Sequence, residues 1–243
     1  MPFSPAVEAC RVADEQLAEA YEATSARHRS WIKTTLALIE SVTPSRPALV
    51  STRIENPAAG FAQTRTRESA PWVVLLIGEG TVSAVRLAAA IMPARLAGVE
   101  SILAVWTGAG TMPHAVIAAL ELTGVEQVFA LPDPAPLLNE LTGRGRLLRF
   151  GNAPVSMAAC PIWKDRAPRL EHSALPEDAL RAHPDALPAA ANADASYAGQ
   201  MLLGEAAPLV LGPGLEGCWL HTDLTPDFFL NERLELAAIP QEA

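Results

Sequence analysis

Residues 71–80 read PWVVLLIGEG, and their composition indicates the fold class. The apolar run from Trp72 to Ile77 has no polar interruption and stands between Pro71 and Gly78. A strand with one solvated face alternates polar and apolar residues, whereas a strand covered on both faces does not. The stretch therefore predicts an inner strand of a parallel sheet with helices on both sides.

Helices and strands are expected to alternate after this strand. Thr81 or Ser83 supplies a helix N-cap, and Gly98 and Gly124 suit the left-handed position that ends a helix. The expected helices span residues 82–96 and 114–123, and the expected strands span residues 101–106 and 126–131. Strand, helix, strand, helix, strand at this spacing predicts a doubly wound α/β fold with a mainly parallel sheet.

The segments before this unit predict a helical arm and a connection. Residues 13–42 carry apolar side chains at helical intervals, which predicts one or two amphipathic helices. Residues 43–71 mix Pro, Ser, Thr and Arg, which predicts a loop or an edge-strand region.

The segments after it are less regular. A short helix is expected within 133–143 and a strand within 146–151, followed by a proline-rich segment of loops and short helices. Strand and turn are expected within 197–204 and 208–214, and a short helix with Thr225 as its cap and Pro226 at its first position within 225–236. Three parts result: an arm and linker (1–65), an α/β core (66–153) and a segment that completes the core (154–243).

Composition excludes several function classes. The chain has 243 residues and a net charge of −9, with 18 Lys and Arg against 27 Asp and Glu. Its basic residues form no stripe that would track phosphates, so nucleic acid is not an expected partner. No apolar run of about 18 residues and no signal-peptide pattern occurs, which predicts a cytoplasmic protein that does not bind membranes. Its three cysteines, Cys10, Cys160 and Cys218, are expected to be reduced and structural.

The stretch MPARLAGVESILAV (92–105), with Pro93 inside an apolar helix, resembles histidinol dehydrogenase. So does HAVIAALELTGVEQVFAL (114–131), and weaker likeness continues in SYAGQMLLGEAAP (196–208), LGPG (211–214) and DLTPDFFLNERLEL (223–236). The resemblance implies an incomplete Rossmann-like domain of the aldehyde and histidinol dehydrogenase superfamily, NAD as cofactor, and a homodimer. The expected dimerisation element is the arm from Ala13 to Val42, with Trp31 on its apolar side.

Departures from the family pattern concern its zinc site. The family's Gln-Ala-Glu-His-Gly stretch has no counterpart between Asn152 and Glu171. Pro208 stands where the family has a zinc-binding Asp, and Leu215 stands where it has a substrate-binding His. Without several ligands that converge on one point, zinc is not expected to bind. The resemblance therefore predicts a shortened relative that does not oxidise histidinol.

Two groups of residues are candidates for chemistry. Glu171 and His172 resemble the adjacent Glu-His pair that the family uses as acid and base, and a buried pair of this kind relays protons near neutral pH; a solvated pair in a proline-rich loop has the same sequence. Cys218 with His221, three residues later, is a second candidate pair.

Glycines in two strand-to-helix turns are candidates for cofactor binding. They are Gly78 and Gly80 in G-E-G-T, and Gly108 and Gly110 in G-A-G-T. Turns of this kind aim backbone N–H groups at a phosphate, although both lack the third glycine of the dinucleotide fingerprint and Glu79 would repel a pyrophosphate. Tight turns with no ligand are the alternative.

Asn152 lies where the family has a turn near the nicotinamide, or belongs to a plain Gly-Asn turn. The sequence therefore leaves three functions open. The protein binds a nucleotide or a small anionic metabolite, or it is a non-catalytic scaffold or regulatory protein that dimerises, or it is an NAD-dependent oxidoreductase of unknown substrate.

Overall fold

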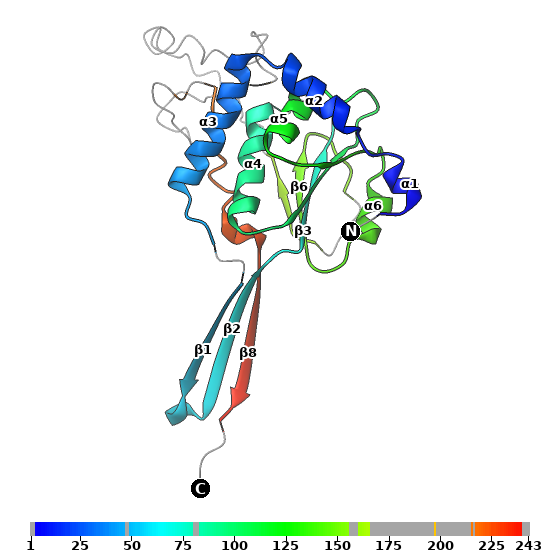
Figure 1. Cartoon of the computed structure of the whole chain (residues 1–243). Coiled ribbons are helices and arrows are strands. Elements are labelled where there is room, and N and C mark those ends of the chain that lie inside the picture. The colour runs from blue at the N-terminus through cyan, green and yellow to red at the C-terminus, as the bar shows by residue number, and fades with distance from the viewer. Residues whose placement is uncertain are drawn as a thin grey trace, which may run out of the picture.

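The computed structural model describes residues 3–46, 49–79, 83–155, 160–165, 197, 215 and 217–239. These residues form an α/β domain, and a narrow antiparallel sheet projects from one end of it (Figure 1).

Five parallel strands form the central sheet. They are β3 (Trp72–Ile77), β4 (Ser101–Trp106), β5 (Gln127–Ala130), β6 (Arg146–Phe150) and β7 (Ile162–Lys164). Their order is β5-β4-β3-β6-β7, and every neighbouring pair is parallel. The predicted α/β fold is confirmed, with β3 at the centre of the sheet as its unbroken apolar run requires.

Helices cover both faces of this sheet (Figure 1). One face carries α2 (Asp14–Ala23), α3 (Ala26–Val42), α4 (Ala84–Leu96) and α5 (His114–Leu122), and the other carries α1 (Pro5–Glu8) and α6 (Ala135–Glu140). Strand β3 serves both sides: Val73, Leu75 and Ile77 belong to the first apolar cluster, and alternate residues such as Val74 and Leu76 belong to the second.

The glycines that follow α4 and α5 end these helices as predicted. Gly98 and Gly124 have φ values of +78° and +67°. Gly98 N donates to Arg95 O at 2.9 Å, and Val99 N donates to Ala94 O at 3.1 Å, which is the Schellman pattern. At the start of α4, the Ser83 side chain accepts a hydrogen bond from Arg86 N at 3.3 Å, so Ser83 is the N-cap.

The predicted N-terminal arm consists of α2 and α3, and it packs within the chain. Helix α3 lies against α4, and α2 lies against α5. The Trp31 side chain is buried, and a Cβ at Gly217 would lie only 2.4 Å from its ring. The apolar side of the arm is thus already covered by this chain's own α/β domain.

Residues 49–69 form two long strands, so the loop alternative for this region was wrong. Strands β1 (Leu49–Asn56) and β2 (Phe61–Ser69) pair antiparallel along their whole length. The turn between them is a short 3₁₀ helix that the Asn56 side chain caps through Ala59 N at 3.0 Å, and Gly60 ends it at φ +74°. A third strand, β8 (Leu230–Ala238), pairs with β2 to give the order β1-β2-β8.

The predicted C-terminal helix was also wrong. Residues Pro226–Phe229 form one 3₁₀ turn, and the chain then continues as β8. Pro226 is the first residue of this turn, the position that was predicted for it in a helix. The Thr225 side chain makes no cap hydrogen bond. Glu, Arg, Leu and Ala favour helices, but nine backbone pairs with β2 outweigh that preference here. The segments 198–204 and 208–214, for which strand and turn are predicted, lie outside the described residues.

No helix within the described ranges is long and apolar enough to cross a bilayer.

Candidate functional site

The strand order reverses between β3 and β6. From β3 the chain runs through β4 to β5 on one side, and β6 then returns to the other side of β3. Open α/β sheets bind their ligands at the carboxyl edge, where the strand order reverses. The turns after β3, β4 and β6, which contain the predicted cofactor-binding residues, all lie at this edge.

Backbone contacts join the turn after β3 to the turn after β6. Gly78 N donates to Phe150 O at 3.0 Å, and Asn152 N donates to Glu79 O at 3.2 Å. A Cβ at Gly78 would lie 2.2 Å from Ala153 N, so no larger residue fits without a backbone shift. Gly78 is therefore explained by the close approach of two turns, and Asn152 takes part through its backbone.

Gly108 has a different structural reason. A Cβ there would lie 2.3 Å from the Trp106 ring, which folds back over its own turn. The indole N–H of Trp106 donates to Gly110 O at 2.8 Å, whereas the Cβ position of Gly110 faces open space. The tight-turn alternative thus accounts for Gly108, and Gly110 leaves room above the turn. Gly80 lies outside the described residues.

Glu79 links the turns after β3 and β4. Its Oε1 atom accepts a hydrogen bond from Ala109 N at 2.9 Å, and its Cγ lies close to Gly108. The second turn thus presents a backbone N–H that already holds an anionic oxygen. This is the polar contact expected of a phosphate-binding turn, although here the chain's own carboxylate makes it.

A buried polar cluster lies beside this edge, between α4 and the end of β7. Arg86 Nη2 and Asp165 Oδ1 lie 2.5 Å apart, and these side chains are only 2% and 5% exposed. The Arg86 guanidinium also lies 5.3 Å from the centre of the Trp219 ring. The sequence did not single out Arg86 or Asp165, because nothing in VRLAAA or WKDR marks either residue as buried.

His221 belongs to this cluster rather than to a catalytic pair with Cys218. Its Nδ1 accepts a hydrogen bond from Trp219 Nε1 at 3.2 Å, and its Nε2 lies 2.9 Å from Arg86 O. These contacts fit the neutral tautomer with its proton on Nε2, which donates to the carbonyl. Since both ring nitrogens are occupied, His221 has no lone pair left to activate a thiol.

Burial lowers the pKa of His221 below its ordinary value of 6.5. The unfolded chain therefore binds a proton near pH 6.5 that the folded chain does not, and the free energy of unfolding should fall as the pH drops below 6.5. The expected slope is up to about 1.4 kcal/mol per pH unit until the folded-state pKa is reached.

Urea denaturation between pH 7.5 and 5 measures this slope. His221→Gln keeps a donor for the Arg86 carbonyl and should flatten the slope, whereas His114→Gln on the exposed start of α5 should leave it unchanged. An equal slope in wild type and His221→Gln would contradict the prediction.

The other predicted site residues fall outside the part of the chain that the structure describes. Glu171 and His172 lie outside the described residues, as does Pro208. Within the described ranges, no three His, Cys, Asp or Glu side chains converge as metal ligands would. The acid-base pair and the expectation about zinc both stay predictions.

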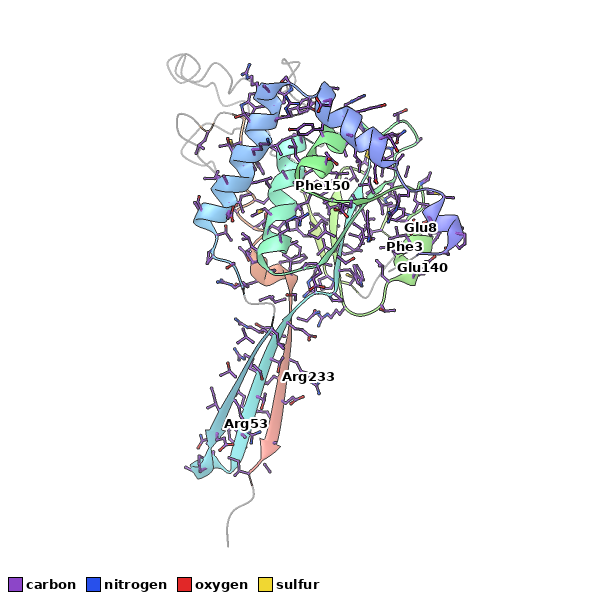
Figure 2. The ribbon with its side chains drawn as sticks, viewed as in Figure 1. Phe3, Glu8, Arg53, Glu140, Phe150 and Arg233 are labelled. Carbon is purple, nitrogen blue, oxygen red and sulfur yellow. The ribbon has the colours of Figure 1, made fainter. Side chains whose placement is uncertain are left out.

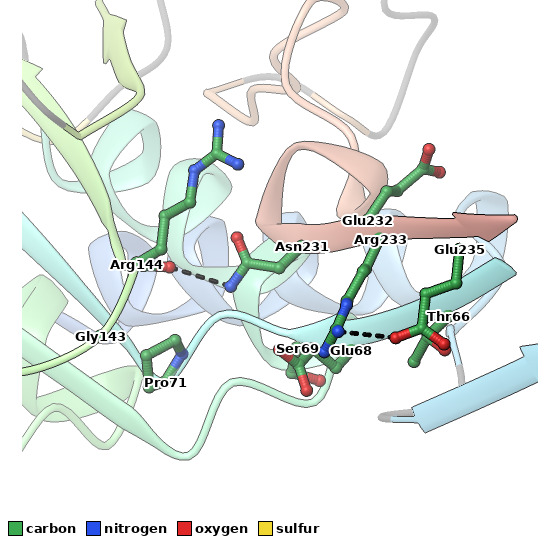
Figure 3. Close-up of a pocket in the computed structure, with 10 residues that line it drawn as sticks. All are labelled: Thr66, Glu68, Ser69, Pro71, Gly143, Arg144, Asn231, Glu232, Arg233 and Glu235. Carbon is green, nitrogen blue, oxygen red and sulfur yellow. Dashed lines mark hydrogen bonds and ion pairs between the residues drawn. The ribbon is translucent and has the colours of Figure 1, made fainter.

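A hollow of about 450 Å³ lies at the opposite, amino edge of the sheet (Figure 3). Polar side chains of β2 and β8 line it, together with the segment that precedes β6. Arg233 pairs with Glu235 at 2.6 Å, and Asn231 Nδ2 donates to Arg144 O at 3.0 Å. This hollow is open and its charges largely neutralise each other, so the carboxyl edge is the better candidate for a ligand site.

Comparison with known proteins identifies the family. The model of the histidinol dehydrogenase family matches residues 2–132. No curated protein sequence matches the chain. Among solved structures, the histidinol dehydrogenase of Elizabethkingia anophelis is similar, with 15% identity and a TM-score of 0.48. That match covers 65% of this chain and 40% of the Elizabethkingia chain. Because the family model matches more than half of the 243 residues, the chain belongs to the histidinol dehydrogenase family.

Proposed function

We propose that this protein binds a ligand with an anionic group, of the nicotinamide nucleotide type, at the carboxyl edge between β3 and β4. The observation that carries the proposal is the hydrogen bond between the Glu79 carboxylate and Ala109 N. The turn amide holds a negatively charged oxygen there, and a phosphate or carboxylate of a ligand would take the same position when the Glu79 side chain swings out.

Two further features support this proposal. Histidinol dehydrogenases use NAD in general, so a nucleotide is the ligand class expected of this family. In addition, α4 begins at the same carboxyl edge with Ser83 as its N-cap, and the N-terminal end of a 13-residue helix favours negative charge. On this proposal histidinol is not the substrate, because the sequence has no counterpart of the family's zinc-binding stretch.

Glu79→Gln tests the proposal. The substitution removes a negative charge that lies within hydrogen-bond distance of the proposed anion position. NAD should therefore bind to the variant roughly three- to tenfold more tightly than to the wild type. Isothermal titration with NAD, and separately with inorganic phosphate, measures the affinity and separates nucleotide recognition from binding of any anion.

Glu126→Gln is the matched control, since Glu126 is exposed at the amino edge of β5. It should bind NAD as the wild type does. If neither the wild type nor Glu79→Gln binds NAD or phosphate at millimolar concentration, the proposed function is wrong.

A second candidate function is a non-catalytic scaffold that acts through self-association. It is favoured by the large apolar side chains that are exposed on the sheet β1-β2-β8, among them Ile54, Leu234 and Leu236.

A further inference from the structure

Pro93 interrupts the hydrogen-bond ladder of α4. The helix runs from Ala84 to Leu96, and Pro93 stands inside it. Because proline has no backbone N–H, the carbonyl of Ala89, four residues earlier, lacks the donor that an unbroken helix supplies. Ala89 is 1% exposed, and no side chain within the described ranges donates to its carbonyl. Buried backbone carbonyls nearly always have a donor, so a donor from outside the chain is expected at this position.

A pocket of about 190 Å³ lies at this interruption, since both Ala89 and Pro93 line it. Helices α3 and α4 lie side by side and pack against each other (Figure 2). The segment 217–225 closes the pocket between them. Hydrogen bonds attach this segment to both helices, through Trp219 N to α3 at 3.3 Å and through His221 Nε2 to α4 at 2.9 Å. The walls of the pocket are therefore held in place by the fold itself.

The lining of this pocket is apolar where it is buried and carries hydroxyl groups where it is exposed. Ile39 and Leu224 are 2% and 3% exposed, whereas Thr222 and Thr225 face solvent. Among the described residues, no Asp, Glu, Lys or Arg lines the pocket. His221 lines it, but both of its ring nitrogens are already engaged in hydrogen bonds. A charged ligand would therefore lose its hydration here without gaining an opposite charge.

We propose that this pocket binds a small uncharged molecule with an apolar body and one hydroxyl or N–H group, which donates to the Ala89 carbonyl. A cavity of roughly 150 Å³ holds one benzene molecule, so this pocket has room for a six-membered ring with one substituent. The apolar body would lie against Ile39, Pro93 and Leu224. It would also cover Val42 at the rim, an apolar side chain that is 58% exposed.

This pocket is separate from the anion site proposed at Glu79. Helix α4 begins at the carboxyl edge of the sheet, and Pro93 lies in its last turn, about 15 Å along the helix from Ser83. The two sites also differ in chemistry, because the first offers a backbone N–H to an anion and the second offers a carbonyl to a donor. A molecule bound at Pro93 would contact α3, α4 and the segment 217–225 together, and it would stabilise their packing.

Phenol and toluene test the proposal with the full chain, because they match in size and only phenol has a donor. Phenol should bind with a dissociation constant on the order of 1 mM, as expected for a ligand of this size. It should bind roughly three- to tenfold more tightly than toluene, which leaves the carbonyl without a donor. Benzoate, whose charge the pocket does not compensate, should bind more weakly than phenol. Chemical-shift changes of backbone amides in α3, α4 and 217–225 measure these affinities and locate the site.

Pro93→Ala tests the hydrogen bond itself. Alanine returns a backbone N–H to the helix, so the Ala89 carbonyl gains an internal donor and phenol should lose its advantage over toluene. The variant is expected to fold, because alanine is favoured over proline inside a helix. A wild type that binds toluene or benzoate as tightly as phenol, or a Pro93→Ala variant that keeps the full preference for phenol, overturns the proposal.

Val42→Phe tests the location of the site. The larger ring should fill the pocket from its exposed rim and weaken the binding of both phenol and toluene several-fold. Val50→Phe is the matched control, since Val50 is also exposed but lies on β1, and it should bind both probes as the wild type does. Unchanged phenol binding in Val42→Phe would place the site elsewhere and reject the proposal. None of these results depends on the anion site, which Glu79→Gln tests separately.

Discussion

Replacing Arg146 by methionine is expected to lower the free energy of unfolding by about 4 kcal/mol, because several buried carbonyl groups lose their donor. Arg146 begins β6 and is 4% exposed. Its Nε donates to Phe228 O at 2.5 Å, and its Nη2 donates to Leu230 O at 2.6 Å. Nη1 adds a bond to Gly145 O at 2.9 Å. One side chain thus attaches the C-terminal segment to the parallel sheet.

Urea denaturation followed by circular dichroism measures the loss. Arg233→Met is the control, since that side chain is 77% exposed and its removal should cost less than about 0.5 kcal/mol. Arg146→Lys keeps the positive charge but has one nitrogen in place of the planar fork, so it should recover only a small part of the loss. A stability of Arg146→Met within 1 kcal/mol of wild type would show that the carbonyl contacts are dispensable.

The α/β unit was predictable because its signals are local. The apolar run of β3, the cap Ser83 and the helix-ending glycines Gly98 and Gly124 each specify their element within a few residues. The alternation of these elements then limits the connections, since parallel strands require crossover helices of one hand.

The projecting sheet was less predictable because its third strand depends on a distant partner. Leu230–Ala238 has strong helix formers and pairs with β2, more than 160 residues earlier in the chain. The alternation of Thr64, Arg65 and Thr66 was a usable strand signal, as was the NPAAG turn at 56–60. Neither signal indicates that β1 will be exposed on both of its faces.

The candidate site was likewise predictable in its local features and not in its contacts between distant segments. The turns with Gly78 and Gly108 lie at the carboxyl edge, after the strands that the sequence predicts. The reason for each glycine was not predictable, because a Cβ atom would meet Ala153 N at Gly78 and the Trp106 ring at Gly108, and both neighbours follow from the folded structure. The sequence predicts only that Glu79 repels a phosphate, and the hydrogen bond from Ala109 N to its carboxylate was not predicted. Arg86, a charged residue in an alanine-rich helix, is typical of a solvent-facing position and is instead buried.

Asp165→Asn is expected to lower the free energy of unfolding by about 3 kcal/mol, because the buried Arg86 charge then loses the carboxylate that compensates it. Asparagine keeps the shape and one acceptor oxygen, so the loss reports the charge rather than a cavity. The pair joins the end of β7 to the first turn of α4, and β7 is an edge strand of only three residues. Hydrogen exchange should therefore increase first in β7 and in the last residues of β6, the strand that pairs with it.

Asp227→Asn is the matched control, because Asp227 pairs with Arg46 at 2.9 Å on the surface, where the two side chains are 56% and 37% exposed. An exposed pair contributes less than about 1 kcal/mol. The double variant Arg86→Met with Asp165→Leu removes both charges and should be more stable than Asp165→Asn, since a buried pair costs desolvation that apolar side chains avoid. If Asp165→Asn and Asp227→Asn reduce stability equally, the buried pair is not what holds β7 to α4.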